Sequence, residues 1–281
     1  MIRSRGFMII CGTTLLLSLV AGGGCAARDR VSPAPAATPY DGPLRVEPTA
    51  PPAPDVPDRG GGAGLAVQCR GEPVGGNRSA PAHPGKVFPS AEDALRDALR
   101  SGAFKGALRE YRKAAESGDR VLYRYEPEGV ARHALVAHHG DSVDGKTGWY
   151  VESWARCDPA DFPDSVTGPT GMQIWTDAKG GRVLTTELYS VRGPDHCGWE
   201  RMTFLHRGGD LAYASDPIPE LAEYSAEPYQ PDLPLPGDAV DSGYHLGDDR
   251  LWFSPDGMRA YVGNPEHVAL WPRTVKLLGC A

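Results

Sequence analysis

Residues 121–156, VLYRYEPEGVARHALVAHHGDSVDGKTGWYVESWAR, contain three strand-like runs separated by two turn sequences. The runs at 121–126, 130–139 and 148–156 are rich in β-branched and aromatic residues, which favour strands. The two segments between them, Pro-Glu-Gly and Asp-Ser-Val-Asp-Gly, contain the residue types that tight turns require. The stretch therefore predicts an antiparallel sheet built from hairpins.

The same pattern continues towards the C-terminus. Runs at 172–176 and 182–190 flank a Lys-Gly-Gly turn and predict a further hairpin. A last group at 250–254, 258–263 and 267–271 is interrupted by Pro255-Asp256-Gly257. We expect strands in each of these runs.

Helical periodicity is confined to one region, which follows Pro89. Ser90 with Asp93 three residues later resembles a capping box, and a hydrophobic face follows it. A second helix is expected to begin near Phe104 and to end at Gly118. Its polar side would carry Arg109, Arg112 and Lys113, as a solvated surface or as a basic docking face.

These elements predict an α+β fold in which an N-terminal helical pair packs on antiparallel β-hairpins. We expect an α+β subdomain at 66–165 and a mainly β subdomain at 166–281. Asp119-Arg120-Val121-Leu122-Tyr123 resembles Asp249-Arg250-Leu251-Trp252-Phe253, and each run is followed by a Pro-acidic-Gly turn. This likeness suggests two similar subdomains. The alternative is that any two hairpins with Pro-acidic-Gly turns resemble each other.

Four cysteines lie in the body of the chain: Cys69, Cys157, Cys197 and Cys280. An even number in an exported protein favours two disulfides, and four cysteines allow three connectivities. The matched separations, 88 and 83 residues, favour Cys69–Cys157 with Cys197–Cys280. Zinc is the alternative, but no Cys-x-x-Cys spacing is present.

The N-terminus is typical of an export signal, with Arg3 and Arg5 before an apolar run. We expect a signal peptide at 1–24 and a lipid attached to Cys25, because Gly-Gly-Gly-Cys resembles a lipobox. A signal-peptidase site nearby is the alternative, which would release a secreted protein. Residues 25–65 are rich in Pro, Gly and Ala and predict a disordered tether.

Charge limits the choice of partner. Without Arg3 and Arg5 the chain has 27 basic and 36 acidic residues, a net charge of −9, which argues against nucleic acid as a partner. Residues 208–249 contain ten acids, six prolines and no Lys or Arg. We expect an exposed loop there that binds a basic or cell-envelope partner, or a solvated surface. Its central acids are Glu220, Glu223, Glu227, Asp232 and Asp238.

No catalytic or metal-binding motif is present. Gly-x-Ser-x-Gly, His-Glu-x-x-His, Ser-x-x-Lys and Walker sequences are absent from the mature body, so we assign no catalytic residue and no cofactor. His133, His138 and His139 share one expected strand, where alternation separates the last two. We expect a solvated hairpin end there rather than a metal site.

The segments at 149–163 (WYVESWARCDPADFP) and 193–205 (GPDHCGWERMTFL), with the closing Gly279-Cys280-Ala281, resemble uncharacterised exported proteins and lipoproteins of high-GC Gram-positive bacteria. That resemblance implies a cell-envelope location and no particular activity. We therefore expect a membrane-tethered binding or structural module, and a secreted hydrolase with a dispersed site as the alternative.

Overall fold

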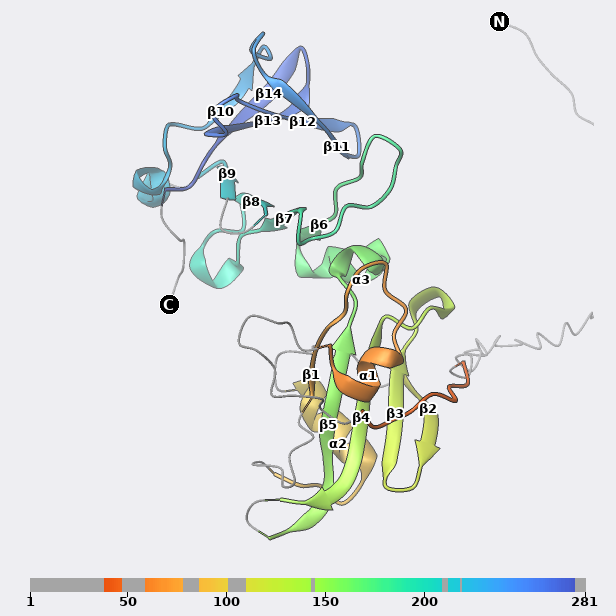
Figure 1. Cartoon of the computed structure of the whole chain (residues 1–281). Helices are drawn as coiled ribbons and strands as arrows, with labels where there is room; N and C mark the ends of the chain where they lie inside the picture. Colours follow the sequence, from red (N-terminus) through yellow and green to blue (C-terminus); the bar gives the residue numbers. More distant parts are fainter. Residues whose placement is uncertain are drawn as a thin grey trace, which may run out of the picture. The chain divides into compact units, whose positions relative to one another are not determined.

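The computed structural model describes residues 38–46, 59–77, 86–100, 110–142, 145–208, 212–217 and 219–275. These residues form mainly antiparallel sheets with few helices (Figure 1). The α+β expectation therefore holds only loosely. The predicted signal peptide, the Cys25 anchor and Cys280 lie outside the described residues, and the division at residue 165 stays a prediction.

The first sheet has five strands in the order β1-β5-β4-β3-β2. Their bounds are Val74–Asn77, Thr147–Arg156, His133–Asp141, Arg120–Tyr125 and Tyr111–Ser117, in that order. The three central strands, β3 to β5, match the runs predicted from residues 121–156. Helices α1 (Gly61–Leu65) and α2 (Ala91–Arg100) both contact β4 and β5.

Side-chain alternation gives this sheet two apolar faces. On one face Leu122 and Val136 pack with Ala63 of α1. On the other face Leu135 packs with Leu95 and Leu99 of α2. Helix α2 begins as predicted, because the Ser90 hydroxyl accepts a hydrogen bond from the Asp93 amide at 3.1 Å.

The predicted tether is wrong in its described parts, because residues 38–46 and 59–65 pack against the sheet. Leu44 and Ala63 are buried in the same cluster. A Cβ atom at Gly60 would lie 2.2 Å from the Trp154 carbonyl oxygen, and one at Gly62 would lie 2.0 Å from the Leu44 carbonyl oxygen. Only glycine permits these approaches, so the glycine run serves packing rather than flexibility.

The predicted second helix is also wrong where the structure describes it. Residues 111–117 form β2, which pairs with β3 across a turn at Gly118 and Asp119. The glycine that suggested a helix end therefore opens a hairpin. Arg109 lies outside the described residues, while Arg112 and Lys113 lie on a strand, so the described residues form no basic helix face here.

The C-terminal part contains two further antiparallel sheets. One has the order β10-β14-β13-β12-β11, with bounds Gln230–Leu233, His267–Pro272, Arg259–Asn264, Asp249–Phe253 and Val240–Leu246. The other has the order β6-β7-β8-β9, with bounds Met172–Gln173, Leu188–Arg192, Thr203–Arg207 and Ala212–Ser215. Short helices occur at Asp164–Thr167 (α3), Pro127–Gly129, Pro159–Asp161, Gly168–Thr170, Asp195–Cys197 and Pro219–Tyr224.

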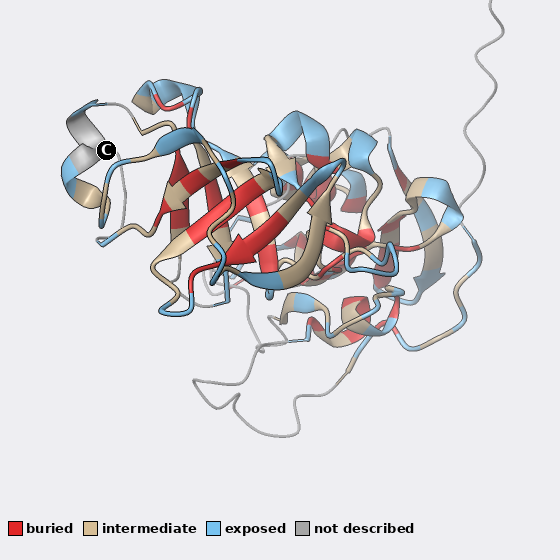
Figure 2. Cartoon of the chain, turned by 90° about the horizontal axis from the view of Figure 1, so that it is seen from above, coloured by how far each residue is buried: buried red, intermediate tan, exposed pale blue. Residues whose placement is uncertain are grey.

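These two sheets share one apolar core, and buried residues follow their strands (Figure 2). Trp175, Leu188 and Leu205 pack there with Leu251 and Phe253. The indole N–H of Trp175 donates to the Ser190 hydroxyl at 2.8 Å, so the buried polar atom is satisfied.

The two five-stranded sheets have the same strand order. In each, the first strand in sequence pairs with the last, and the remaining strands follow as consecutive hairpins. The equivalent turns Gly118-Asp119 and Gly247-Asp248 join β2 to β3 and β11 to β12.

The predicted acidic loop at 208–249 is wrong as a description of the backbone, because this segment contains β9, β10 and β11. Two of its acids, Glu227 and Asp232, form ion pairs with Arg259 at 2.6 Å and with His267 at 2.9 Å. Glu223 and Asp238 are exposed, and the side chain of Glu220 lies outside the described residues. Binding of a partner by these acids stays a prediction.

Cys69 and Cys157 form a disulfide with their Cα atoms 5.1 Å apart, which confirms the first predicted pair and excludes connectivities that separate them. Cys197 is also disulfide-bonded. Its predicted partner Cys280 lies outside the described residues. None of the helices in the described ranges is both long and apolar enough to span a membrane.

Candidate ligand-binding cleft

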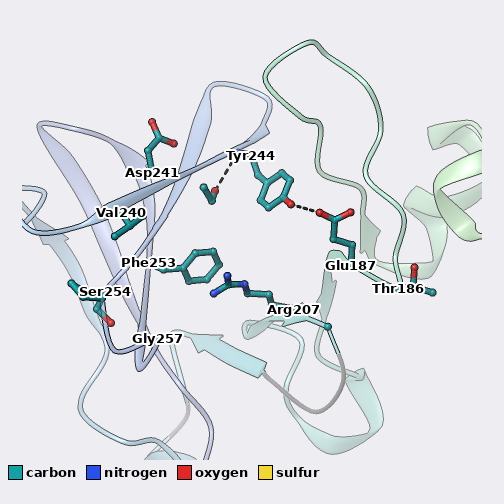
Figure 3. Close-up of a pocket in the computed structure, with 12 residues that line it drawn as sticks. Thr186, Glu187, Arg207, Val240, Asp241, Tyr244, Phe253, Ser254 and Gly257 are labelled. Carbon is teal, nitrogen blue, oxygen red and sulfur yellow. Dashed lines mark hydrogen bonds between the residues drawn. The ribbon is translucent and has the colours of Figure 1, made fainter.

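An open cleft of about 870 Å³ is lined by residues from both C-terminal sheets (Figure 3). Its walls are the turn before β7, the end of β8, strand β11, and the end of β12 with the turn after it. The phenol of Tyr213 on β9 donates a hydrogen bond to the Gly257 carbonyl at 2.8 Å and holds that turn. The volume falls within the range of small-molecule sites in proteins.

Arg207 lies at the C-terminal end of β8 and is exposed. Its guanidinium carbon lies 4.1 Å from the centre of the Phe253 ring, and Figure 3 shows the two side chains in contact. The aromatic face attracts the cation and restricts its orientation. No carboxylate within the described ranges forms a salt bridge with Arg207. Its N–H groups therefore remain available to an anion.

Tyr244 and Glu187 form a second polar pair in the cleft. The Tyr244 hydroxyl donates to Glu187 Oε1, as Figure 3 shows. This hydrogen bond, with burial as a smaller cause, raises the pKa of Tyr244 above its usual value. The phenol therefore stays protonated at neutral pH and keeps donating to the carboxylate.

The other polar groups of the cleft are held by local contacts. Asp241 Oδ1 accepts from the Gly243 amide at 2.8 Å, and Asp241 Oδ2 pairs with Arg250. The Ser242 hydroxyl donates to the Leu251 carbonyl at 2.6 Å. The Ser254 hydroxyl donates to Asp256 at 2.5 Å. Among the described lining residues there is no histidine, and the group that accepts the Ser254 proton is the carboxylate of Asp256.

Arginines in a second cavity, of about 510 Å³, are engaged differently. Arg70 pairs with Asp161 at 2.5 Å and also donates to the Ala160 carbonyl. Arg182 pairs with Asp164 at 2.7 Å and donates to the carbonyls of Ala160 and Phe162. These guanidinium groups hold a loop in place, whereas the Arg207 guanidinium donates no hydrogen bond to a residue that the structure describes.

The three histidines of β4 lie on the faces that strand alternation predicts, with His138 on the opposite face from His133 and His139. His133 is buried, and burial lowers its pKa to about 3. His138 Nε2 lies 2.8 Å from Asp119 Oδ2, and its Nδ1 lies 2.9 Å from the Tyr150 hydroxyl. Only His139 is exposed, so the expected solvated hairpin end is correct for this residue alone.

A bulge in β5 completes this polar cluster on the first sheet. Val136 pairs with Ser153 and Ala137 with Val151, so Glu152 has no partner on β4. The bulge turns Glu152 towards Arg120, which donates two hydrogen bonds to its carboxylate, each of 2.8 Å. Both side chains are largely buried.

In the described ranges, the side chains that could hold a metal ion converge at Cys69, Cys157 and Asp161. The two sulfur atoms are bonded to each other. They are therefore not available as thiolate ligands.

Sequence reasoning missed Glu187, Arg207, Tyr244 and Phe253 as site residues. They come from the turn before β7, from β8 and from the β11–β12 hairpin, and none belongs to a motif. One signal was present: Arg207 is the last cation before the cation-free segment 208–249. No family model, curated protein or solved structure matches this chain.

Proposed function

We propose that this chain is a lipid-anchored, extracytoplasmic binding protein whose small-molecule ligand lies in the cleft beside Arg207. The observation that carries the proposal is the exposed guanidinium on the Phe253 ring, which has no carboxylate partner among the described residues. A cation held in this way on an aromatic surface is suited to bind an anionic group of a ligand.

The polar groups of the cleft favour binding over catalysis. Ser242 and Ser254 donate their hydroxyl protons to fixed acceptors, the Leu251 carbonyl and the Asp256 carboxylate, and the described lining residues include no histidine. A site of this kind can orient a ligand through hydrogen bonds and apolar contact. Its described residues include no serine–histidine pair of the kind that acyl transfer uses.

A secreted hydrolase is the second candidate, and one observation favours it. His138 is held between the carboxylate of Asp119 and the phenol of Tyr150, as a general base would be. Tyr150 is only 3% exposed, which restricts access of a substrate to the phenol. If the protein hydrolyses esters or peptides, His138→Gln should abolish that activity, and Arg207→Gln should leave it unchanged.

The envelope location rests on the N-terminal sequence and is tested separately. Cys25→Ser should release the protein into the culture medium, because acyl chains on Cys25 would provide stable anchoring. A matched control is Cys11→Ser, which alters a cysteine within the predicted signal peptide. Wild-type protein that is already free in the medium, with an unacylated N-terminus, would contradict the anchor.

Binding is tested on the full-length protein purified in detergent. A thermal-shift screen should cover amino acids, sugars, carboxylic acids and phosphate esters, and calorimetry should follow for any class that shifts the midpoint. Arg207→Gln should weaken binding by about tenfold or more, because a charged hydrogen bond is lost. Arg201→Gln is the control, since Arg201 is exposed and paired with Asp216 outside the cleft. Binding that Arg207→Gln leaves unchanged, or no binding in any class, overturns the proposal.

A further inference from the structure

The cleft holds two charged groups of opposite sign that are not paired with each other. Arg207 lies opposite Leu188 in the β7–β8 ladder, and the amide of Gly208 donates to the Glu187 carbonyl at 2.9 Å. The backbones of Glu187 and Arg207 are therefore close. Nevertheless, the two side chains form no salt bridge in the part of the chain that the structure describes.

Each of these groups has one side engaged and one side free for a ligand. Phe253 covers a face of the Arg207 guanidinium and leaves its N–H edge open. Tyr244 donates to Glu187 Oε1, and no described group donates to Oε2. In contrast, both carboxylate oxygens of Asp241 are occupied.

An apolar surface adjoins the two charges. Val240 is 56% exposed and lines the cleft on β11, and the exposed Pro255 lines it in the turn after β12. An exposed valine on an edge strand gains free energy when a ligand covers it. The cleft therefore presents an anion site, a cation site and an apolar patch together.

We infer that the cleft binds a zwitterionic amino acid with an apolar side chain. This inference rests on the proposed function and names its ligand class. The ligand carboxylate pairs with Arg207, its ammonium group pairs with Glu187 Oε2, and its side chain lies against Val240 and Pro255. Both ends of the ligand then find a partner of opposite charge.

The charges of the cleft favour a zwitterion over a doubly charged anion as the ligand. The charged residues of the described lining are Glu187, Arg207 and Asp241, and Arg250 balances the charge of Asp241. A phosphate dianion would gain from Arg207, be repelled by Glu187 and keep one negative charge without a partner. A zwitterion adds no net charge and satisfies both signs.

The test uses L-leucine, leucine methyl ester and N-acetyl-leucine with the full-length protein in calorimetry. The ester lacks the carboxylate and the acetyl derivative lacks the ammonium group. Leucine should bind about tenfold or more tightly than either derivative, because each loses one charged hydrogen bond. The other common amino acids serve as further probes in the thermal-shift screen.

Two variants test which residue binds each charged group of the ligand. Arg207→Gln should make leucine and its methyl ester bind equally. Glu187→Gln should make leucine and N-acetyl-leucine bind equally, and its amide oxygen can still accept from Tyr244. Arg201→Gln is the control and should retain the wild-type order of affinities.

The outcomes separate this inference from the proposed function. If N-acetyl-leucine binds wild type as tightly as leucine, or if only sugars or phosphate esters bind in an Arg207-dependent manner, the zwitterion is wrong and the binding function stands. If no amino acid and no other class binds, both fail.

Discussion

Gly118 and Gly247 open equivalent turns in the two five-stranded sheets, with φ of 60° and 61°. Each turn is two residues long and joins the second strand of its sheet to the third in sequence. No atom lies within 4 Å of a Cβ built at either position. A side chain there would therefore meet no steric obstacle, and only the left-handed backbone would resist it.

Replacing either glycine with alanine should lower the free energy of unfolding by about 1 kcal/mol, because alanine disfavours the left-handed conformation. Urea denaturation of Gly118→Ala and Gly247→Ala measures this loss. Gly168→Ala is the control, since Gly168 has φ of −54° and equally open surroundings. It should leave stability unchanged or slightly raised. Equal losses in all three variants would show that the turn conformation is not the cause.

Removing one member of the buried pair Arg120–Glu152 should destabilise the protein more than replacing both members with apolar residues. Glu152→Gln should lower the free energy of unfolding by about 3 kcal/mol, because Arg120 would remain charged and buried with only the half-exposed Asp119 as an ionic partner. The double variant Arg120→Met with Glu152→Leu should lose less than the single variant. Urea denaturation compares the two.

The exposed pair Lys113–Glu116 provides the control for this experiment. Its side chains are 58% and 54% exposed, so Glu116→Gln should change stability by less than about 1 kcal/mol. If the double variant at Arg120 and Glu152 is as unstable as Glu152→Gln, then packing rather than an unpaired charge explains the loss.

Because His133 is buried, we expect the protein to lose stability below neutral pH. Burial lowers the pKa of His133 to about 3, whereas an unfolded histidine has a pKa near 6.5. Between these values the unfolded chain binds a proton that the folded chain does not. The free energy of unfolding should therefore fall by about 1.4 kcal/mol per pH unit as pH drops below about 6.5.

Urea denaturation at pH 7.0, 6.0 and 5.0 measures this slope, and His133→Gln should reduce it. His206 also has a pKa lowered by burial, so a smaller slope in the same direction should remain in that variant. His139→Gln is the control, because His139 is exposed. The assignment fails if His133→Gln keeps the full wild-type slope.

The disulfides should map as Cys69–Cys157 and Cys197–Cys280 in a non-reducing peptide digest. The first bridge joins residues 88 positions apart, and removing it with two serines should cost about 4 kcal/mol by the chain-entropy estimate. Thermal unfolding of the double variant measures that loss. A peptide that joins Cys197 to a cysteine other than Cys280 would contradict the second pair.

The sequence predicted those helices, turns and strands that depend on contacts between residues close in sequence. Ser90 marks the start of α2 by its own hydrogen bond, and the turns around Gly129 and Gly257 separate strands that pair with their neighbours in sequence. Gly118 was misinterpreted because a glycine ends helices and opens hairpins alike. The pairing of Tyr111 with Tyr125 decides between the two, and this contact is tertiary.

The cleft and the glycine-rich segment could not be predicted for the same reason. Gly60 and Gly62 look like a linker until the carbonyls of Trp154 and Leu44 are placed against them. Arg207 and Phe253 are far apart in sequence, and their contact depends on how two sheets share a core. Such sites have no local pattern, since neither residue type is unusual at the end of a strand.

The pairing of the first strand with the last in each five-stranded sheet has a consequence for the order of assembly. In the described ranges β10 pairs with β14. Strand β10 (Gln230–Leu233) therefore cannot form its hydrogen bonds in the sheet until β14 (His267–Pro272) has been synthesised. The sheet therefore cannot grow steadily from its first strand as the chain emerges, and closure of the long intervening segment slows it. A chain that ended before His267 would leave both β10 and β13 as open edges, ready to pair with another molecule.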